Sequence, residues 1–341
     1  MTTAARNLAP VSLETPAVGP VSRRPLGIVL ARWVVVLLVA LVPLLLGSFR
    51  LQLFTEALSY ALLAMSLDLL LGVAGMPSLG QALYFGVGAY AAGLIALHLT
   101  ANLFIGMALG AALSAGVAAV TGWFVVRAKA TYLIMLTLAI GEIGATVATS
   151  WESVTGGDQG LVGMPAATLW GNYTVSSLTH LSSLYLLSLL LVLAVYAGLT
   201  TFMHSPAGVA LQGVRDNENR MRALGYPVTG YKLAAFTLAG AIAGLGGALH
   251  AGFSETVSPG DVGFSLSALV LVMVLIGGVG TIWGPIVGAV FVIIVRDELS
   301  AHFQQWEALV GAIFVFFVYF LPTGVSGSRQ QVGRLVARLR Q

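Results

Sequence analysis

The residues best suited to chemistry in this sequence lie in one stretch, "HSPAGVALQGVRDNENRMRALG", at positions 204–225. Only 9% of the 341 residues are charged, yet eight consecutive positions hold Arg215, Asp216, Glu218, Arg220 and Arg222. Acid precedes base by four positions in Asp216–Arg220 and Glu218–Arg222, and each such pair stabilises a helix by about 0.2–0.5 kcal/mol. Ser205 suits the N-cap, Pro206 the first helical position and Gly225 the C-terminal stop. The spacing predicts one short helix over 205–225.

This predicted helix has three interpretations. A capped, charged helix is suited to docking against another protein, and a solvated loop helix would have the same composition. An anchor for lipid headgroups would favour a cationic face opposite bulky apolar residues. Here the charges are of both signs, and the stretch contains no Trp or Phe. Composition therefore argues against the anchor and leaves docking and a solvated helix open.

Other kinds of site are excluded by residue type. There are no cysteines, which removes disulfides, thiolate metal sites and cysteine nucleophiles. The five histidines have no pair at metal-ligand spacing, and His98 and His250 are expected to be interfacial or structural. The two lysines, Lys129 and Lys232, lie in no phosphate-binding loop. We therefore expect no metal, no cofactor and no enzymatic activity in this chain.

The apolar runs define the elements that must position any site. The chain is 58% hydrophobic with a mean hydropathy of +0.94, and its runs repeatedly reach the ~20 residues that cross a bilayer. We predict an all-α polytopic membrane protein with about ten transmembrane or half-spanning helices. The predicted spans are 27–48, 52–71, 83–100, 103–126, 131–150, 180–203, 231–253, 264–277, 285–298 and 305–321. Small residues in 86–93, 106–116 and 239–252 favour close helix packing.

Basic residues orient these spans. With the N-terminus inside, fourteen Lys and Arg residues fall inside and only Arg50 and Arg296 outside, as the positive-inside rule requires. Both termini are therefore predicted to be cytoplasmic. The pI near 9.3 has the same source, so we reject nucleic-acid binding. The predicted organisation is a disordered cytoplasmic tail (1–25), a transmembrane domain (26–322) and a basic cytoplasmic tail (323–341). Within the domain, 151–178 forms an external loop.

Two glycine-rich interruptions divide apolar regions, "GVAGMPSLGQ" at 72–81 and "GGVGTIWGP" at 277–285. Clustered Gly and Pro residues break helices. Paired interruptions in the two halves of a membrane protein point to a transporter with an internal repeat and a substrate path. Two ordinary tight turns would have the same sequence. Ser78, Gln81, Gly277 and Gly278 are the candidate path residues at these breaks, and the glycines also fit a purely backbone role.

Two carboxylates lie within predicted spans. Glu142, in "LAIGEIGAT", is flanked by Gly141 and Gly144, with Thr137 near one face. Because ionisable groups inside spans face protein or water, Glu142 and Thr137 are candidates to line a substrate path. A hydrogen-bonded contact between helices and a proton-relay group are the alternatives for Glu142. Asp68, beside the first break, is expected to make a structural contact at the end of its helix.

Four segments resemble one family of membrane proteins in the order in which they occur. "SPAGVALQGVRDNENRMRALGYPVTGYKLAAFTLAGAIAGLGGAL" is similar to the cytoplasmic loop and following helix of permeases from branched-chain amino acid ABC transporters. "GVAGMPSLGQALYFGVGAYAAGLIA", "VTGGDQGLVGMP" and "SALVLVMVLIGGVGTIWGPIVGAV" resemble other segments of that family. The resemblance runs from about residue 52 to 322. The tail and the external loop are similar to those of the LivM-type member of the permease pair.

The resemblance implies partners and sites. It implies a second, homologous permease, two separate ATPases that bind ATP and Mg²⁺, an external solute-binding protein, and a bacterial inner-membrane location. In that family the cytoplasmic helix is the coupling helix, seated in the ATPase. Its positions here are Gly208, Leu211, Val214, Arg215, Asp216, Asn217, Glu218, Arg220, Ala223, Leu224 and Gly225. The external loop, through Gly156, Gly157, Asp158 and Gly160, would dock the binding protein, although a plain connector would have the same composition.

The function implied is that of the permease subunit of an ATP-driven importer. Its substrates would be branched-chain amino acids or similar small polar solutes. Urea, short amides and small carboxylates are associated with related permeases and are not separated by these residues. An autonomous proton-coupled transporter using Glu142 and a passive small-solute channel are the alternatives. Neither requires a charged helix for docking a motor.

Overall fold

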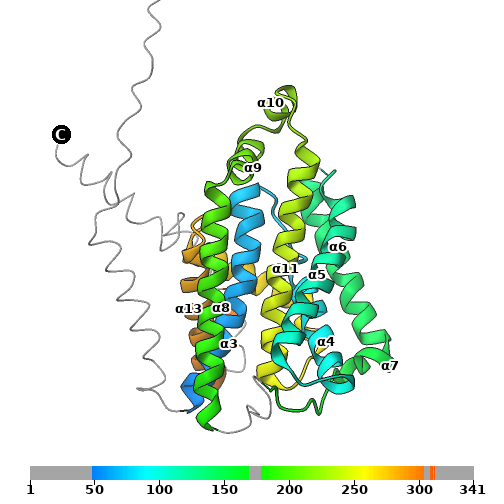
Figure 1. The fold of residues 1–341 in the computed structure, drawn as a ribbon, viewed down its shortest axis with the longest axis vertical. Coiled ribbons are helices and arrows are strands. Elements are labelled where there is room, and N and C mark those ends of the chain that lie inside the picture. The colour runs from blue at the N-terminus through cyan, green and yellow to red at the C-terminus, as the bar shows by residue number, and fades with distance from the viewer. Residues whose placement is uncertain (1–47, 129, 169–177, 303–307, 310, 312–341) are drawn as a thin grey trace, which may run out of the picture. The chain divides into compact units, whose positions relative to one another are not determined.

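The computed structural model describes residues 48–128, 130–168, 178–302, 308–309 and 311 (Figure 1). They belong to one of the two compact units of the chain, Pro43–Gln341. The all-α prediction is confirmed: in these ranges the regular elements are helices, with two isolated β-bridges and no strand. Outside the described residues lie positions 27–47 of the predicted span 27–48, most of 305–321, both tails, and positions 169–177 of the predicted external loop.

The helices match the predicted spans closely. The long elements are α3 (Ser48–Asp68), α4 (Gln81–His98), α5 (Leu103–Val125), α6 (Ala130–Ser150), α8 (Leu178–His204), α11 (Val228–Ser254), α12 (Phe264–Gly277) and α13 (Trp283–His302). The short ones are the π-helix η1 (Leu69–Ala74), α7 (Glu152–Thr155), η2 (Gly157–Gln159), α9 (Pro206–Asp216), α10 (Glu218–Ala223) and η3 (Pro259–Asp261).

Five stretches of these helices are long and apolar enough to cross a membrane: Arg50–Ala74, Leu103–Val125, Tyr132–Ser150, Ser182–His204 and Val228–Ser254. They differ in burial. In the most apolar window of Arg50–Ala74, 94% of the residues are buried, against 22% in Tyr132–Ser150 and Ser182–His204. Helix α3 is therefore central, whereas α6 and α8 present broad apolar faces outward, and α6 lies at the edge of the bundle (Figure 1).

Helices α4, α5 and α11 pack closely through small residues, as predicted. A methyl group at Gly88 would overlap the backbone of Gly244, and one at Gly247 would overlap the carbonyl of Phe85. Ser114 of α5 donates a hydrogen bond to the carbonyl of Tyr84 in α4 at 2.8 Å. With backbones this close, dispersion contacts and such hydrogen bonds replace the hydrophobic effect that lipid cannot supply.

Both glycine-rich interruptions are breaks between helices. Helix α3 widens into the π-helix η1 and stops at Gly75, which adopts the left-handed conformation, and α4 starts at Gln81. Helix α12 stops at Gly277, Gly278 and Gly280 have positive φ, and α13 starts at Trp283. Ile282 also has a positive φ of 52°, a conformation that is strained for a β-branched residue.

The single helix predicted over 205–225 is wrong, because the chain breaks at Asn217 into α9 and α10. Asn217 is extended (φ −159°, ψ 96°) and its side chain accepts a hydrogen bond from the Arg220 amide at 2.9 Å. Asn competes with helix backbone bonds in this way. The predicted Asp216–Arg220 pair is not formed between these described residues. Asp216 instead pairs with Arg215 at 3.3 Å, whereas the Glu218–Arg222 pair is confirmed at 2.6 Å.

The predicted ends of this segment are confirmed. The Ser205 hydroxyl accepts a hydrogen bond from the Gly208 amide at 3.2 Å, and Pro206 occupies the first helical position of α9. Gly225 follows α10 with φ 84°, a conformation that favours glycine.

Candidate functional site

The two helix breaks meet at Asp68. Its Oδ1 accepts a hydrogen bond from the Gly280 amide at 2.6 Å, and its Oδ2 accepts one from the Ile282 amide at 3.0 Å. Asp68 is completely buried. Gly72 lies at the same junction, where a methyl group would overlap the Gly280 backbone. The expected structural contact of Asp68 is confirmed, and its partner is the second break, 212 residues further along the chain.

The first break is held by hydroxyl groups from two other helices. Thr137 of α6 accepts a hydrogen bond from the Leu79 amide at 3.1 Å, and Ser267 of α12 accepts one from the Ala82 amide at 3.1 Å. Ser78 accepts one from the Gly80 amide at 3.3 Å. These hydroxyls satisfy amides at the start of α4 that have no partner within the helix. Sequence reasoning missed Ser267, because a single serine in an apolar run carries no distinguishing signal.

Gln81 differs from the other polar residues of the first break. It is 1% exposed, and neither its Oε1 nor its Nε2 has a hydrogen-bond partner among the described residues. A buried, unpaired amide costs about 1–3 kcal/mol for each unsatisfied group. Ser78 and Thr137 are used by the backbone, whereas Gln81 retains donor and acceptor capacity at the break.

Gly277 and Gly278 serve the backbone of the second break. A methyl group at Gly277 would overlap the Gly284 carbonyl, and Gly278 has a φ of 108°. Thr281 closes the turn by donating to the Gly278 carbonyl at 2.7 Å and accepting from the Gly284 amide at 3.2 Å. Of the two roles open for these glycines, this geometry supports the conformational one.

Glu142 is exposed on α6, away from the buried Thr137 on the same helix. Its neighbours on the outward face are apolar and include Tyr132, Met135 and Ile143, which are 67%, 66% and 63% exposed. The structure therefore groups Ser78, Gln81 and Thr137 around the first break and places Glu142 apart from them. An exposed carboxylate in an apolar stripe requires water or another protein to solvate it.

Helix α9 is anchored to the bundle. It buries Gly208, Ala210, Leu211 and Val214, and a methyl group at Gly208 would overlap the Phe202 carbonyl. Arg215 points inward: its Nη1 donates a hydrogen bond to the Gly72 carbonyl, and its stem packs against Gly75. The charged segment therefore contacts the first break directly.

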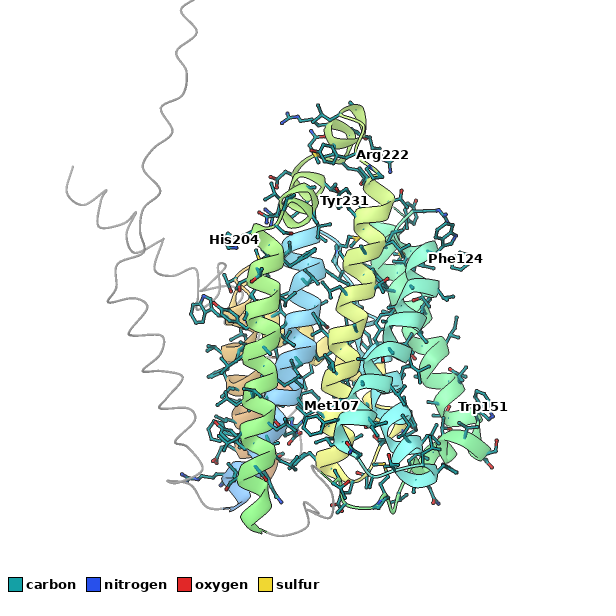
Figure 2. All side chains as sticks on the ribbon, in the orientation of Figure 1. Met107, Phe124, Trp151, His204, Arg222 and Tyr231 are labelled. Atoms are coloured by element: carbon teal, nitrogen blue, oxygen red, sulfur yellow. The ribbon has the colours of Figure 1, made fainter. Side chains whose placement is uncertain are left out.

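Helix α10 has no buried residue and projects from the end of the described bundle, where Arg222 is labelled in Figure 2. Glu218 joins it to α11 through an ion pair with Lys232 and forms a second ion pair with Arg222 within α10, both at 2.6 Å. Partial burial acts to raise the pKa of Glu218, but the hydrogen bonds and charges of Lys232 and Arg222 outweigh burial and hold that pKa below its ordinary value. Leu224, just after α10, is 66% exposed.

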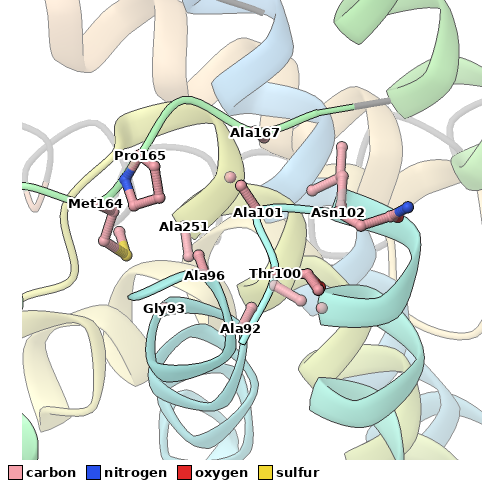
Figure 3. Close-up of a pocket in the computed structure, with 14 residues that line it drawn as sticks. Ala92, Gly93, Ala96, Thr100, Ala101, Asn102, Met164, Pro165, Ala167 and Ala251 are labelled. Atoms are coloured by element: carbon pink, nitrogen blue, oxygen red, sulfur yellow. The ribbon is translucent and has the colours of Figure 1, made fainter. Parts of the chain in front are cut away.

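The segment 155–168 folds against the opposite end of the bundle. Gly156, Gly157 and Gly160 all have positive φ, while Asp158 is exposed. Leu161 and Val257 exchange backbone hydrogen bonds at 2.9 and 3.0 Å. A cavity of about 20 Å³ is bordered by Met164 and Pro165 of this segment and by Asn102, among others (Figure 3). That volume holds about one water molecule.

Nearer the end of the bundle that carries 155–168, a partly buried polar cluster joins α3 to α13. Glu56 of α3 forms an ion pair with Arg296 of α13, whose guanidinium lies 5.8 Å from the Tyr60 ring centre. His250, buried as a structural residue should be, lies 5.4 Å from the Tyr60 ring, and its Nε2 is 4.0 Å from Asp261 Oδ1. Among the described residues no cluster of His, Asp and Glu is arranged to hold a metal ion.

These features describe a polytopic membrane protein whose two interrupted helix pairs meet in its interior, with a charged segment attached at one end. The family described as "branched-chain amino acid transport system / permease component" matches residues 49–318. The chain belongs to this family, so it is a multi-pass transport permease.

Two kinds of relative are similar to it. The high-affinity branched-chain amino acid transport system permease protein LivM of Salmonella typhimurium is 29% identical over 305 residues, covering 83% of this chain and 71% of that protein. LivM of Escherichia coli is 28% identical over the same shares of both chains. The permease protein LivH of Escherichia coli is 24% identical over 292 residues, covering 79% and 91%. No solved structure matches this chain.

Proposed function

We propose that this chain is the permease subunit of an ATP-driven ABC importer that carries branched-chain amino acids or similar small polar solutes. The family and the LivM relatives support transport of this substrate class. The observation that carries the ATP-driven part is the charged segment 205–225. Helix α10 of this segment buries none of its residues and can contact another protein, whereas α9 is hydrogen-bonded to the first break through Arg215.

The distribution of basic residues supports the orientation. Among the described residues, Arg127, Arg215, Arg220, Arg222 and Lys232 belong to the end that carries α9 and α10, whereas Arg50 and Arg296 belong to the other end. We infer that the first end is cytoplasmic. The termini would lie on that side of a bacterial inner membrane, and 151–168 would lie outside.

The partners follow from this arrangement. LivM and LivH are two permease proteins of branched-chain amino acid systems, and both resemble this chain, which supports a second, homologous permease beside this one. Two ATPases would bind ATP and Mg²⁺ and contact α9 and α10. The contact surface would centre on the half-buried Glu218 and on the exposed Arg220, Arg222, Ala223 and Leu224. A solute-binding protein would dock at 156–160, through Asp158 and the backbone that the three glycines shape.

The pathway would run along the face of this chain that meets the second permease. The exposed face of α6 with Glu142 fits that position, because a partner or a water-filled path would solvate its carboxylate. Gln81, buried and unpaired at the first break, is the candidate for a group that becomes accessible when the pathway opens. Selectivity would depend mainly on the binding protein.

Affinity purification of the tagged chain from its native membrane, followed by mass spectrometry, tests this proposal. We expect a second permease and ATPases that carry phosphate-binding loops. Arg220→Glu with Arg222→Glu should weaken recovery of the ATPases, and Arg127→Glu is the matched control at the same end of the bundle. Uptake of radiolabelled leucine that requires a proton gradient but no ATPase would overturn the proposal and favour proton coupling through Glu142. In that case Glu142→Gln should abolish the gradient-driven uptake.

A further inference from the structure

We infer that Arg215 is a positioning residue that links the motion of α9 to both helix breaks, with Asp68 as the second link. This inference rests on the proposed function, since it concerns how an ATP-driven movement would reach the pathway. It gives Arg215 a role different from that of the other arginines in the charged segment.

The first link joins α9 to the first break. Arg215 donates to the carbonyl of Gly72 in η1, and a methyl group at Gly75 would lie 2.5 Å from its Cγ. Gly75 adopts the left-handed conformation that ends η1. The side chain thus reaches the backbone at the point where the first helix stops, and little space separates them. A shift of α9 must therefore move this backbone or break the contact.

The second link joins the first break to the second. Gly72, whose carbonyl Arg215 contacts, packs directly against Gly280, with Asp68 one helical turn before it. Asp68 in turn accepts hydrogen bonds from Gly280 and Ile282. Charged hydrogen bonds to backbone amides in a dry interior are among the stronger contacts a protein can make. The two breaks are therefore expected to move together.

The third step extends the link along the bundle. Helix α3 is held at two separated places. Asp68 bonds the break that leads directly into α13, and Glu56 pairs with Arg296 of α13 about three turns away. Two fixed points prevent the helices from sliding past one another. A displacement that enters at Arg215 would thus move α3 and α13 as one body, including their ends remote from α9.

The neighbouring arginines make different contacts. Arg222 pairs with Glu218 on the surface of α10, with its side chain 60% exposed. Arg220 is exposed on the same short helix, which buries none of its residues. Arg215 and Arg220 carry the same charge five positions apart, but only Arg215 contacts a break. Arg127, just after α5 at the same end of the bundle, is also exposed and donates to the Trp123 carbonyl of that helix. Arg127→Gln is therefore the control for Arg215→Gln.

The test uses the whole importer, purified with its partners and reconstituted with the binding protein, and it measures leucine uptake and ATP hydrolysis together. We expect Arg215→Gln to retain the ATPases and their activity while uptake per ATP falls by about tenfold, within the range of coupling between distant sites. Arg127→Gln should leave uptake per ATP unchanged. Loss of the ATPases from Arg215→Gln would overturn the inference, because Arg215 would then be a docking residue, and the proposed function would stand. A wild-type chain that binds no ATPase would overturn both.

A double-mutant comparison separates a serial link from general structural damage. Asp68→Asn keeps one oxygen acceptor and removes the charge, and should also lower uptake per ATP. If the residues act in series, the double variant loses no more coupling than either single variant, whereas independent damage would multiply. A multiplied loss would overturn the inference. If Arg215→Gln fails to assemble, Arg215→Lys replaces it, since it keeps the charge and much of the stem and should retain an intermediate coupling.

The distance between two spin labels reports the movement itself, which a change in stability alone would not alter. The chain has no native cysteine, so Val279→Cys at the second break and Val162→Cys at the opposite end would be its only labelling sites. Both positions are exposed, by 40% and 62%. The distance between the labels should change when nucleotide binds and should stop changing in Arg215→Gln. An unaltered nucleotide response in that variant would contradict the link.

Discussion

The two helix breaks are held in different ways. Amides of the first break donate one hydrogen bond each to Thr137 of α6 and Ser267 of α12, and Arg215 of α9 donates to the adjoining Gly72 carbonyl. Two amides of the second break donate to one carboxylate, Asp68 of α3. The hydrogen bonds of the first break are therefore shared among side chains of several helices, whereas both hydrogen bonds of the second break go to a single carboxylate. The loss of Asp68 should therefore cost more than the loss of any single hydroxyl.

The largest expected effect is that of Asp68→Ala. It leaves the Gly280 and Ile282 amides buried without their acceptor, at about 1–3 kcal/mol for each group. Thermal unfolding of the purified chain in detergent, followed by size-exclusion chromatography, measures the loss. Asp158→Ala, in an exposed loop, is the control and should have little effect. Equal midpoints for the two variants would show that Asp68 does not hold the second break.

Gly72→Ala should follow, because its methyl group would press against both the second break and Asp68, at 2.6 Å from the Oδ1 of that side chain. The added methyl group would overlap the backbone of Gly280, and overpacking of this kind costs about 1–3 kcal/mol. Gly198→Ala is the matched control on α8, where a methyl group meets nothing within 4 Å. That control should be neutral or stabilising by up to about 1 kcal/mol. A Gly72→Ala protein that unfolds no earlier than Gly198→Ala would contradict the close approach of the breaks.

Thr137→Val tests the distributed support of the first break. It removes the acceptor for the Leu79 amide while preserving shape, at a cost of about 1 kcal/mol. In Thr146→Val the lost hydroxyl bonds only to the Glu142 carbonyl of its own helix, so the midpoint should hardly change. Hydrogen exchange of the Leu79 amide should be faster in Thr137→Val and unchanged in Thr146→Val. That result would locate the effect at the first break.

The smallest effect concerns the attachment of α10, remote from both breaks. The pKa of Glu218 is held below its ordinary value, so the ion pairs stabilise the fold fully above the ordinary carboxyl pKa. That stabilisation is lost as pH falls through the lowered, folded-state pKa. The protection factors for amide hydrogen exchange over 217–224, which correct for the intrinsic pH dependence of exchange, should therefore fall in acid in the wild-type chain. Glu218→Gln should exchange faster at neutral pH and show no such acid dependence. A wild-type segment insensitive to acid would show that the ion pairs do not hold α10.

Much of the fold could be predicted from spacing along the chain. Apolar runs located the helices, and the glycine-rich stretches 72–81 and 277–285 located both breaks. Ser205 and Gly225 correctly marked the ends of the charged segment. The error at Asn217 came from the same local rules, because the i,i+4 charge pairs favoured one continuous helix while the capping side chain of Asn217 favoured a break, and the second preference prevailed.

The candidate site was only partly accessible to such reasoning. Glu142 and Thr137 belong to one helix, and their spacing does not say which of them faces the interior. Arg215 and Arg220 are equivalent as residue types and both are exposed, yet only Arg215 reaches a break. Ser267 has no signature at all. Each of these distinctions depends on which neighbour covers a given helix face.

Local periodicity and capping were thus sufficient for the helices, the breaks and the membrane-protein class, because those properties depend on residues a few positions apart. The meeting of the breaks at Asp68 and the inward direction of Arg215 were decided by tertiary packing. Asp68 and Gly280 are 212 positions apart, and only the close approach of the intervening helices brings a carboxylate to amides that the second break leaves without partners in its own helices.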